Sequence, residues 1–154
     1  MKRLSRSITT LSVVALLVGA ASVSMRGQWA PKAGEWPTYS GDLAATRYSP
    51  LDQINAGNFG KLQLAFRFTT ENLGPRPEFQ YQATPLMVNG RLFTTAGTRR
   101  AAVARDATTG EMLWMHSVNE DTRAAAAPRQ LSGRGVAYWS DGSEERVYYV
   151  TTSW

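Results

Sequence analysis

Short apolar or alternating segments recur along this chain roughly every 8–12 residues, and turn residues separate them. Two of the turns, Asn89-Gly90 and Thr109-Gly110, contain glycine where a tight hairpin needs positive φ. An early segment at residues 62–68 alternates large apolar with polar or small side chains, which is typical of a half-buried strand. Further strands are expected at residues 84–88, 91–96, 101–106, 111–118, 135–139 and 146–152. This rhythm predicts an all-β fold: a sandwich, a barrel or a propeller.

Two segments interrupt the rhythm and are expected to be loops. Residues 70–81 contain one glycine and two prolines, and residues 119–133 are polar except for four alanines at 124–127, which favour one helical turn. Long ordered loops in a β-protein usually carry function. The aromatic, β-branched segment 146–154 is still strand-like where the sequence stops. Because an unpaired strand edge invites aggregation, we expect the chain to be a fragment of a longer protein.

Composition excludes several kinds of site. The chain has no cysteine, which excludes a disulfide framework, a thiolate metal site and a cysteine nucleophile. His116 is the single histidine, and we expect it to lie on a strand face without a catalytic or metal-binding role. The formal net charge of +5 falls to +2 once Lys2, Arg3 and Arg6 are set aside. We therefore expect no nucleic-acid partner.

Residues 1–24 have the pattern of a secretory signal peptide. A basic start precedes an apolar run at residues 8–21, and small residues follow at 19–22. The run is about 14 residues long, shorter than the roughly 20 needed to span a bilayer. An uncleaved membrane anchor is the alternative. After this signal we expect a polar leader at residues 25–35 and the folded domain at residues 36–154.

Residues 104–114 fit the pattern A-x-D-x-x-T-G-x-x-x-W. Asp106 and Thr109 can hydrogen-bond the turn backbone, and Gly110 can supply positive φ. The indole of Trp114, on the next strand, can stack on peptide planes of a neighbouring sheet while its N–H finds a carbonyl. An ordinary hairpin is the alternative, since D-x-x-T-G is common in turns.

This pattern resembles the tryptophan-docking motif of the eight-bladed β-propeller quinoproteins, the alcohol and glucose dehydrogenases that depend on pyrroloquinoline quinone (PQQ). Residues 36–58 resemble the opening of these enzymes, and residues 64–68 resemble their first strand, with Phe66 where the family usually has tryptophan. Residues 82–90 and 134–139 resemble the starts of the first two blades. The resemblance covers residues 36–154 and implies an all-β fold with about one and a half blades of the propeller.

The resemblance implies two cofactor-binding residues. Gln82 matches the first-blade residue that contacts PQQ, and Arg134 matches the second-blade arginine that contacts the quinone ring system. A guanidinium suits PQQ, a planar tricarboxylate, because it pairs bidentately with such oxygens. Methanol-type members carry Glu at the position of Gln82, and the adjacent Cys-Cys pair of the alcohol dehydrogenases is missing at residues 129–133. Both departures favour a glucose dehydrogenase-like branch. The alternatives are that Gln82 is only a polar residue at the start of a strand and that Arg134 is only a surface arginine.

For the full-length parent, the resemblance implies a periplasmic PQQ-dependent dehydrogenase, with membrane association left open. It would oxidise an alcohol or an aldose by hydride transfer to PQQ, assisted by Ca²⁺, and pass electrons to a cytochrome or a membrane quinone. The calcium ligands and the catalytic aspartate are expected beyond Trp154, so no catalytic or metal-binding residue is assigned in this fragment, which we expect to be inactive alone. Two alternatives remain: a non-enzymatic propeller scaffold of outer-membrane assembly, and a self-contained small β-domain with a binding role.

Overall fold

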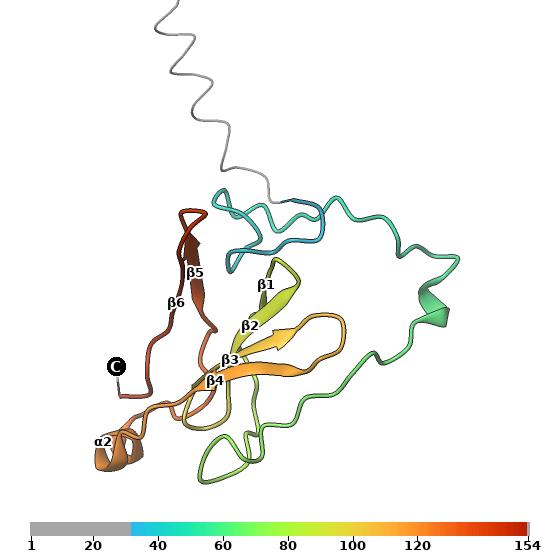
Figure 1. Cartoon of the computed structure of the whole chain (residues 1–154). Helices are drawn as coiled ribbons and strands as arrows, with labels where there is room; N and C mark the ends of the chain where they lie inside the picture. Colours follow the sequence, from blue (N-terminus) through green and yellow to red (C-terminus); the bar gives the residue numbers. More distant parts are fainter. Residues whose placement is uncertain (1–31, 154) are drawn as a thin grey trace, which may run out of the picture. The chain divides into compact units, whose positions relative to one another are not determined.

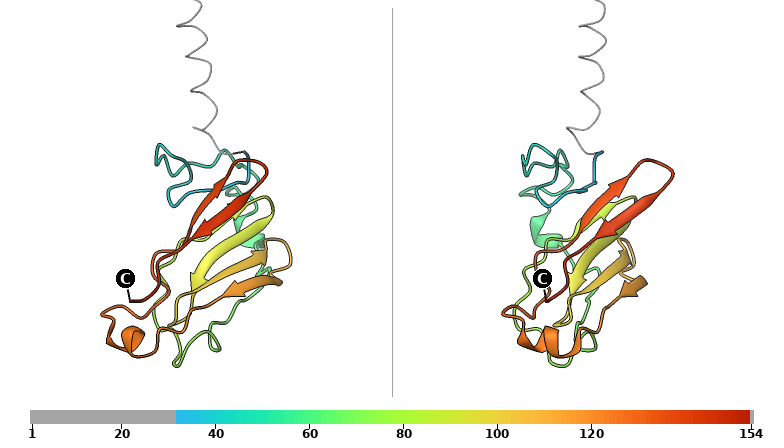
Figure 2. Two further views of the ribbon diagram at one scale, coloured as in Figure 1. Left: turned by 60° about the vertical axis from the view of Figure 1, so that its left-hand side comes forward. Right: turned by 90° about the vertical axis from the view of Figure 1, so that its left-hand side faces the viewer.

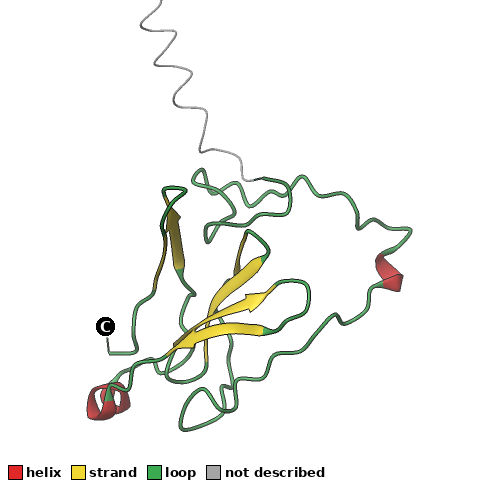
Figure 3. Ribbon diagram, in the orientation of Figure 1, coloured by secondary structure: helices red, strands yellow, loops and turns green. Residues whose placement is uncertain are grey.

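The structure, a computed structural model, describes residues 32–153. The predicted signal peptide, the leader up to residue 31 and Trp154 lie outside the described residues. Strands and loops predominate, and the stretch that leads to the first strand is nearly all loop (Figures 1 and 3). The elements are the 3-10 helix η2 (Phe59–Lys61), the strands β1 (Leu86–Val88), β2 (Arg91–Ala96), β3 (Ala101–Asp106) and β4 (Met112–His116), the helix α2 (Asp121–Ala126), and the strands β5 (Ala137–Ser140) and β6 (Glu145–Tyr148).

Strands β1 to β4 form one antiparallel sheet in chain order. The β1–β2 turn places Asn89 and Gly90 at φ values of 50° and 74°, which an Asn-Gly pair accepts with little strain. Strands β2 and β3 pair along their whole lengths, and the register to β4 shifts between Ala104 and Arg105. Strands β5 and β6 form a second, two-stranded sheet. One complete four-stranded meander and half of another match the predicted one and a half blades.

The β5–β6 hairpin packs against one face of the four-stranded sheet (Figure 2). Leu86, Phe93 and Ala104 form the buried row on this face, and Tyr138 from the hairpin stacks on Phe93 with ring centroids 5.7 Å apart. Full burial of a leucine or phenylalanine contributes about 1.5–3 kcal/mol to folding. This row therefore fixes where the second sheet begins relative to the first.

The opposite face of the four-stranded sheet is covered by the preceding loop. Leu73 and the partly buried Phe68 pack on Ala96, Ala101 and Val103. Period-2 alternation sends successive side chains of β2 and β3 to these two clusters, so both faces of the sheet are buried near its centre. A sheet covered on both faces fits a propeller blade, which packs between neighbours.

The turn of the A-x-D-x-x-T-G-x-x-x-W pattern forms as its residue types predict. The Asp106 carboxylate accepts hydrogen bonds from the backbone N–H groups of Thr108 and Thr109, at 2.9 and 2.8 Å, and Gly110 has a φ of 75°. A side chain at Gly110 would also collide with the Phe66 ring, since an added Cβ would lie 2.3 Å from its Cγ. Glycine is therefore required at this position both for its φ and for its contact.

Four sequence-based expectations differ from the structure. Residues 62–68 are not a strand, because among residues 32–153 no neighbouring strand pairs with them. Trp114 is 39% exposed and lies 6.0 Å from the Phe93 ring of its own sheet, rather than on peptide planes of a neighbouring one. Strand β6 ends at Tyr148, so residues 149–153 leave the sheet. The expected helical turn forms over residues 121–126, slightly earlier than the alanines alone predict.

Candidate functional site

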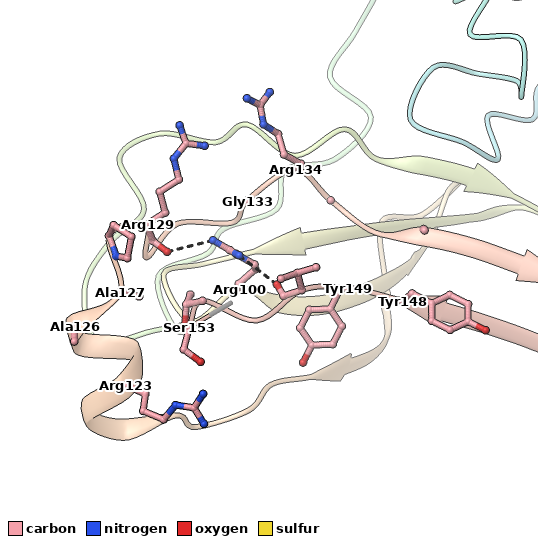
Figure 4. Close-up of a pocket in the computed structure, with 15 residues that line it drawn as sticks. Arg100, Arg123, Ala126, Ala127, Arg129, Gly133, Arg134, Tyr148, Tyr149 and Ser153 are labelled. Carbon is pink, nitrogen blue, oxygen red and sulfur yellow. Dashed lines mark hydrogen bonds between the residues drawn. The ribbon is translucent and has the colours of Figure 1, made fainter.

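A cavity of about 830 Å³ lies between the start of β5, the end of β6, helix α2 and the loop that joins α2 to β5 (Figure 4). Its lining contains four arginines, Arg100, Arg123, Arg129 and Arg134, and no acidic side chain. The rest of the lining is mainly apolar or aromatic, including Tyr149. A concave, cationic and partly apolar surface of this kind suits a planar anionic ligand.

The predicted residue Arg134 lines this cavity between two glycines with positive φ, Gly133 at 76° and Gly135 at 105°. Neither glycine has room for a side chain, because an added Cβ would lie 2.8 Å from Arg100 Nε at Gly133 and 2.9 Å from the Thr84 carbonyl oxygen at Gly135. The Gly-Arg-Gly segment is thus pressed between two parts of the first blade. It presents the Arg134 side chain at an exposed position on the cavity rim.

The structure brings the segments of the two predicted site residues together. The backbone N–H of Thr84 donates to the carbonyl oxygen of Arg134 at 3.4 Å, which places the approach to β1 beside the approach to β5. Gln82 is exposed two residues before Thr84 and does not line the cavity. Its neighbour Tyr81 is fixed by a hydroxyl contact of 2.5 Å to Thr94 on β2. Gln82 and Arg134 therefore lie at the same ends of the two sheets.

Two guanidinium groups of the cavity have no partner in the part of the chain that the structure describes. Within residues 32–153, neither Arg129 nor Arg134 makes a side-chain hydrogen bond or ion pair, and both side chains point the same way in Figure 4. The buried hydroxyl of Tyr149, also on the lining, lacks a hydrogen-bond partner in the described chain. The unpaired guanidinium groups of Arg129 and Arg134 are therefore available to a ligand rather than engaged in the fold.

Glu78 anchors the loop that carries Arg134. Its two carboxylate oxygens accept hydrogen bonds from the backbone N–H of Ser132, at 2.9 Å, and from that of Gly97, at 3.0 Å. Gly97 lies in the β2–β3 turn, so this one side chain joins the second-blade loop to the first blade. The position of Arg134 is thus set by the four-stranded sheet as well as by its own hairpin.

Glu120 holds the opposite wall of the cavity, at residues 151–153. Its carboxylate accepts from the hydroxyls of Thr151 at 2.8 Å, Thr152 at 2.7 Å, and Ser153. These hydroxyls, that of Ser153 most of all, hold the pKa of Glu120 at about 2, below its ordinary value of 4.5. The ionised carboxylate therefore keeps the chain after β6 beside the start of α2.

We expect this contact to weaken in acid. A carboxylate with a lowered folded-state pKa stabilises the fold above its unfolded pKa, and the stabilisation disappears as the pH falls from about 4.5 toward 2. In the full-length protein that contains this chain, Glu120→Gln should speed hydrogen exchange across residues 150–153 at pH 6. The difference from wild type should shrink at pH 3. Glu71→Gln, at an exposed loop position, is the control. An equal difference at both pH values would contradict the assignment.

Residues 32–153 contain no group of three or more His, Cys, Asp or Glu side chains that could hold a metal ion. His116 lies on β4, exposed, with its ring 6.1 Å from that of Tyr149. No helix in the described residues has the length and apolar character to cross a bilayer.

Sequence reasoning missed most of the cavity. Arg100 sits in a hairpin turn next to Arg99 and looks like a solvated charge, and Arg129 lies in a polar loop. No local sequence motif marks Glu120 or Tyr149 as part of a site. One weak signal was present: Gly133-Arg134-Gly135 places an arginine between two glycines, as a backbone held close to another segment requires.

Comparisons with known proteins agree with the resemblance found in the sequence. The family model for the PQQ glucose/ethanol/alcohol dehydrogenase β-propeller domain matches residues 36–154. The dehydrogenase subunit of a quinone-type alcohol dehydrogenase from Gluconobacter oxydans is 37% identical over 122 residues, which cover 77% of this chain and 14% of that protein.

Solved structures similar to this chain are also dehydrogenases. The crystal structure of the quinohemoprotein alcohol dehydrogenase from Comamonas testosteroni matches with a TM-score of 0.60 and 33% identity, over 71% of this chain and 16% of that one. A europium-containing methanol dehydrogenase matches with a TM-score of 0.54 and 27% identity, over 71% of this chain and 19% of that one. The chain thus spans less than a fifth of the length of each of these three relatives.

Proposed function

Because the chain belongs to the PQQ glucose/ethanol/alcohol dehydrogenase β-propeller family, we propose that it forms the start of the cofactor-binding propeller of a PQQ-dependent dehydrogenase. One observation carries the proposal. The segments of Gln82 and Arg134 hydrogen-bond to each other through Thr84, where Arg134 lines a cavity with its guanidinium unpaired in the described chain.

The residues present fit PQQ. A planar tricarboxylate needs cationic donors, and the unpaired guanidinium groups of Arg129 and Arg134 supply them without disturbing any ion pair of residues 32–153. Bound PQQ supplies a hydride acceptor for substrate oxidation. Arg134 would bind and orient an oxygen of the cofactor, and Gln82 would offer an amide N–H at the neighbouring blade end.

We place the calcium ion and the catalytic aspartate outside residues 32–153. The described residues contribute binding and orientation, and no proton transfer is assigned to them. Electrons would pass to a cytochrome or a membrane quinone. This division is consistent with the small share of its relatives that the chain spans.

The proposed substrate is an alcohol. The support is that the relatives reported above are named as alcohol and methanol dehydrogenases. Gln82 and the missing cysteine pair favour a second candidate, a glucose-like aldose. The non-enzymatic scaffold is the competing proposal, because such a propeller would bind no quinone.

The full-length protein, loaded with PQQ and Ca²⁺, should reduce an artificial electron-accepting dye in the presence of a primary alcohol. Glucose in place of the alcohol separates the two substrate classes, and omission of PQQ is the control. PQQ-dependent dye reduction supports the dehydrogenase. A folded protein that neither binds PQQ nor reduces dye with either substrate would instead support the scaffold.

We also propose export to the periplasm. When the protein is expressed in a Gram-negative host, about 20–25 residues should be removed from its N-terminus, because an apolar run of about 14 residues is short for a stable membrane anchor. The intact mass of the exported protein measures this directly, and a variant with Lys2, Arg3 and Arg6 replaced by glutamate, which should be exported poorly, is the control. Met1 retained on the exported protein would contradict the prediction.

A further inference from the structure

Arg100 is the most connected side chain of the cavity. It is only 9% exposed, in the β2–β3 turn, and its guanidinium donates to four backbone carbonyl oxygens. Nε donates to Leu131 at 3.0 Å, and Nη2 donates to Arg129 at 3.2 Å. Nη1 donates to Thr151 at 2.9 Å and to Val150 at 3.3 Å. Figure 4 shows it at the centre of the site.

The four acceptors belong to two walls of one cavity. Residues 129–131 lead into Gly133 and Arg134, and residues 150–151 follow β6. One side chain of the first blade therefore ties together two segments of the second that are separated by the β5–β6 hairpin. Since neither segment is a strand, the β-ladder cannot fix the distance between them.

Arg100 also sets the backbone path at Gly133. A Cβ there would lie 2.8 Å from Arg100 Nε, so the loop runs directly over the guanidinium. The residue after this contact is Arg134. A change at Arg100 would release the loop one residue before the proposed cofactor contact.

Burying the Arg100 guanidinium costs hydration free energy, which indicates that the side chain has a role beyond closing the turn. A charged group that is mostly buried loses its hydration, which lowers the pKa of Arg100. The Glu120 carboxylate opposes this loss electrostatically, but no described carboxylate lies within ion-pair distance of the guanidinium. A turn between two strands needs no buried arginine, and the adjacent Arg99 is exposed. The guanidinium is used instead as a rigid fork with several donors, which lysine cannot replace.

We propose that Arg100 is a positioning residue of the cofactor site, which holds the Arg134 loop and the 150–153 wall in their binding arrangement before PQQ arrives. The inference rests on the proposed function. A site whose walls are held in advance loses less free energy to ordering when its ligand binds. Arg100 itself need not touch the cofactor.

The test is a PQQ titration of the full-length, calcium-loaded apoprotein, followed by fluorescence quenching, with each variant's melting temperature recorded beside it. Arg100→Met should weaken PQQ binding about tenfold, a loss typical of residues that orient a ligand-binding group. Arg100→Lys should recover little of it, because one ammonium cannot reach both walls. Arg99→Ala, the adjacent exposed arginine, should bind as wild type does.

A double-mutant cycle with Arg134→Ala separates positioning from plain stability. If Arg100 acts through Arg134, the two losses overlap, and Arg134→Ala should cost much less affinity in the Arg100→Met protein than in wild type. If Arg100→Met does not fold, the cycle is run with Arg100→Lys. Fully additive losses, or affinity within twofold of wild type in a folded Arg100 variant, would overturn the inference.

The outcomes also distinguish this inference from the proposed function. A wild-type protein that binds no PQQ overturns the proposed function and, with it, the role of Arg100. Loss of binding in Arg134→Ala without loss in Arg100→Met overturns the role of Arg100 alone.

Discussion

Replacing Arg134 with alanine in the full-length protein is expected to weaken PQQ binding by roughly ten- to a hundredfold. The guanidinium lies on the cavity rim without a partner in the described chain, so its pairing with a cofactor oxygen breaks no existing bond. A charge-assisted hydrogen bond is worth about 1.5–3 kcal/mol, which gives this range. Arg134→Lys should recover only part of the loss, because ammonium keeps the charge but not the fork.

Arg146→Ala is the matched control for this experiment. Arg146 lies on β6, pairs with Glu144 in an exposed salt bridge, and does not itself line the cavity. Because exposed ion pairs contribute little to folding, its loss should change stability only slightly and leave PQQ affinity unchanged. Wild-type affinity within twofold in a folded Arg134→Ala protein would remove Arg134 from the site.

Gly97→Ala is expected to destabilise the protein by about 3 kcal/mol or more. Gly97 lies in the β2–β3 turn with a φ of 73°, a conformation that alanine adopts only with strain. An added Cβ would also lie 2.2 Å from the carbonyl oxygen of Leu73, which is backbone and cannot rotate away. The loop that covers one face of the first blade would have to move, and the Glu78 bond to Gly97 would move with it.

Gly90→Ala isolates the steric part of this effect. Gly90 has nearly the same φ, 74°, but a Cβ there meets no atom within 4 Å. Its cost should be that of the left-handed backbone alone, about 1–2 kcal/mol. Thermal and urea denaturation of both full-length variants measures the difference. Equal losses at the two glycines would show that the contact with Leu73 does not constrain the turn.

Local chemistry predicted much of the fold. The strands joined by Asn89-Gly90 and Thr109-Gly110 appear where turn type and alternation place them, because hairpin register depends on residues close in sequence. The strand predicted at residues 62–68 does not form, because pairing depends on residues that are distant in sequence. Of the apolar side chains that should share one face, Phe68 packs on the core but Leu62 and Leu64 are exposed. A strand also needs a partner, which residues 32–153 do not provide.

The site was predictable only in part. Gln82 and Arg134 came from resemblance, but the hydrogen bond that joins their segments depends on how two sheets pack. Arg100 and Glu120 act on carbonyls and hydroxyls about 30 to 50 residues away, and no spacing rule reports such contacts. Their residue types are those of ordinary surface charges. Burial separates Arg100 from such charges, and the three hydroxyl partners separate Glu120. Both are properties of the folded chain.

The central claim is that this chain helps to bind PQQ, and an equilibrium titration of the purified full-length apoprotein with PQQ tests it most directly. The experiment is done with calcium present, and binding is followed by quenching of tryptophan fluorescence. We expect saturation at one PQQ per chain, with weaker binding in Arg134→Ala and unchanged binding in Arg146→Ala. A folded wild-type protein whose fluorescence shows no saturable response to PQQ would contradict the account.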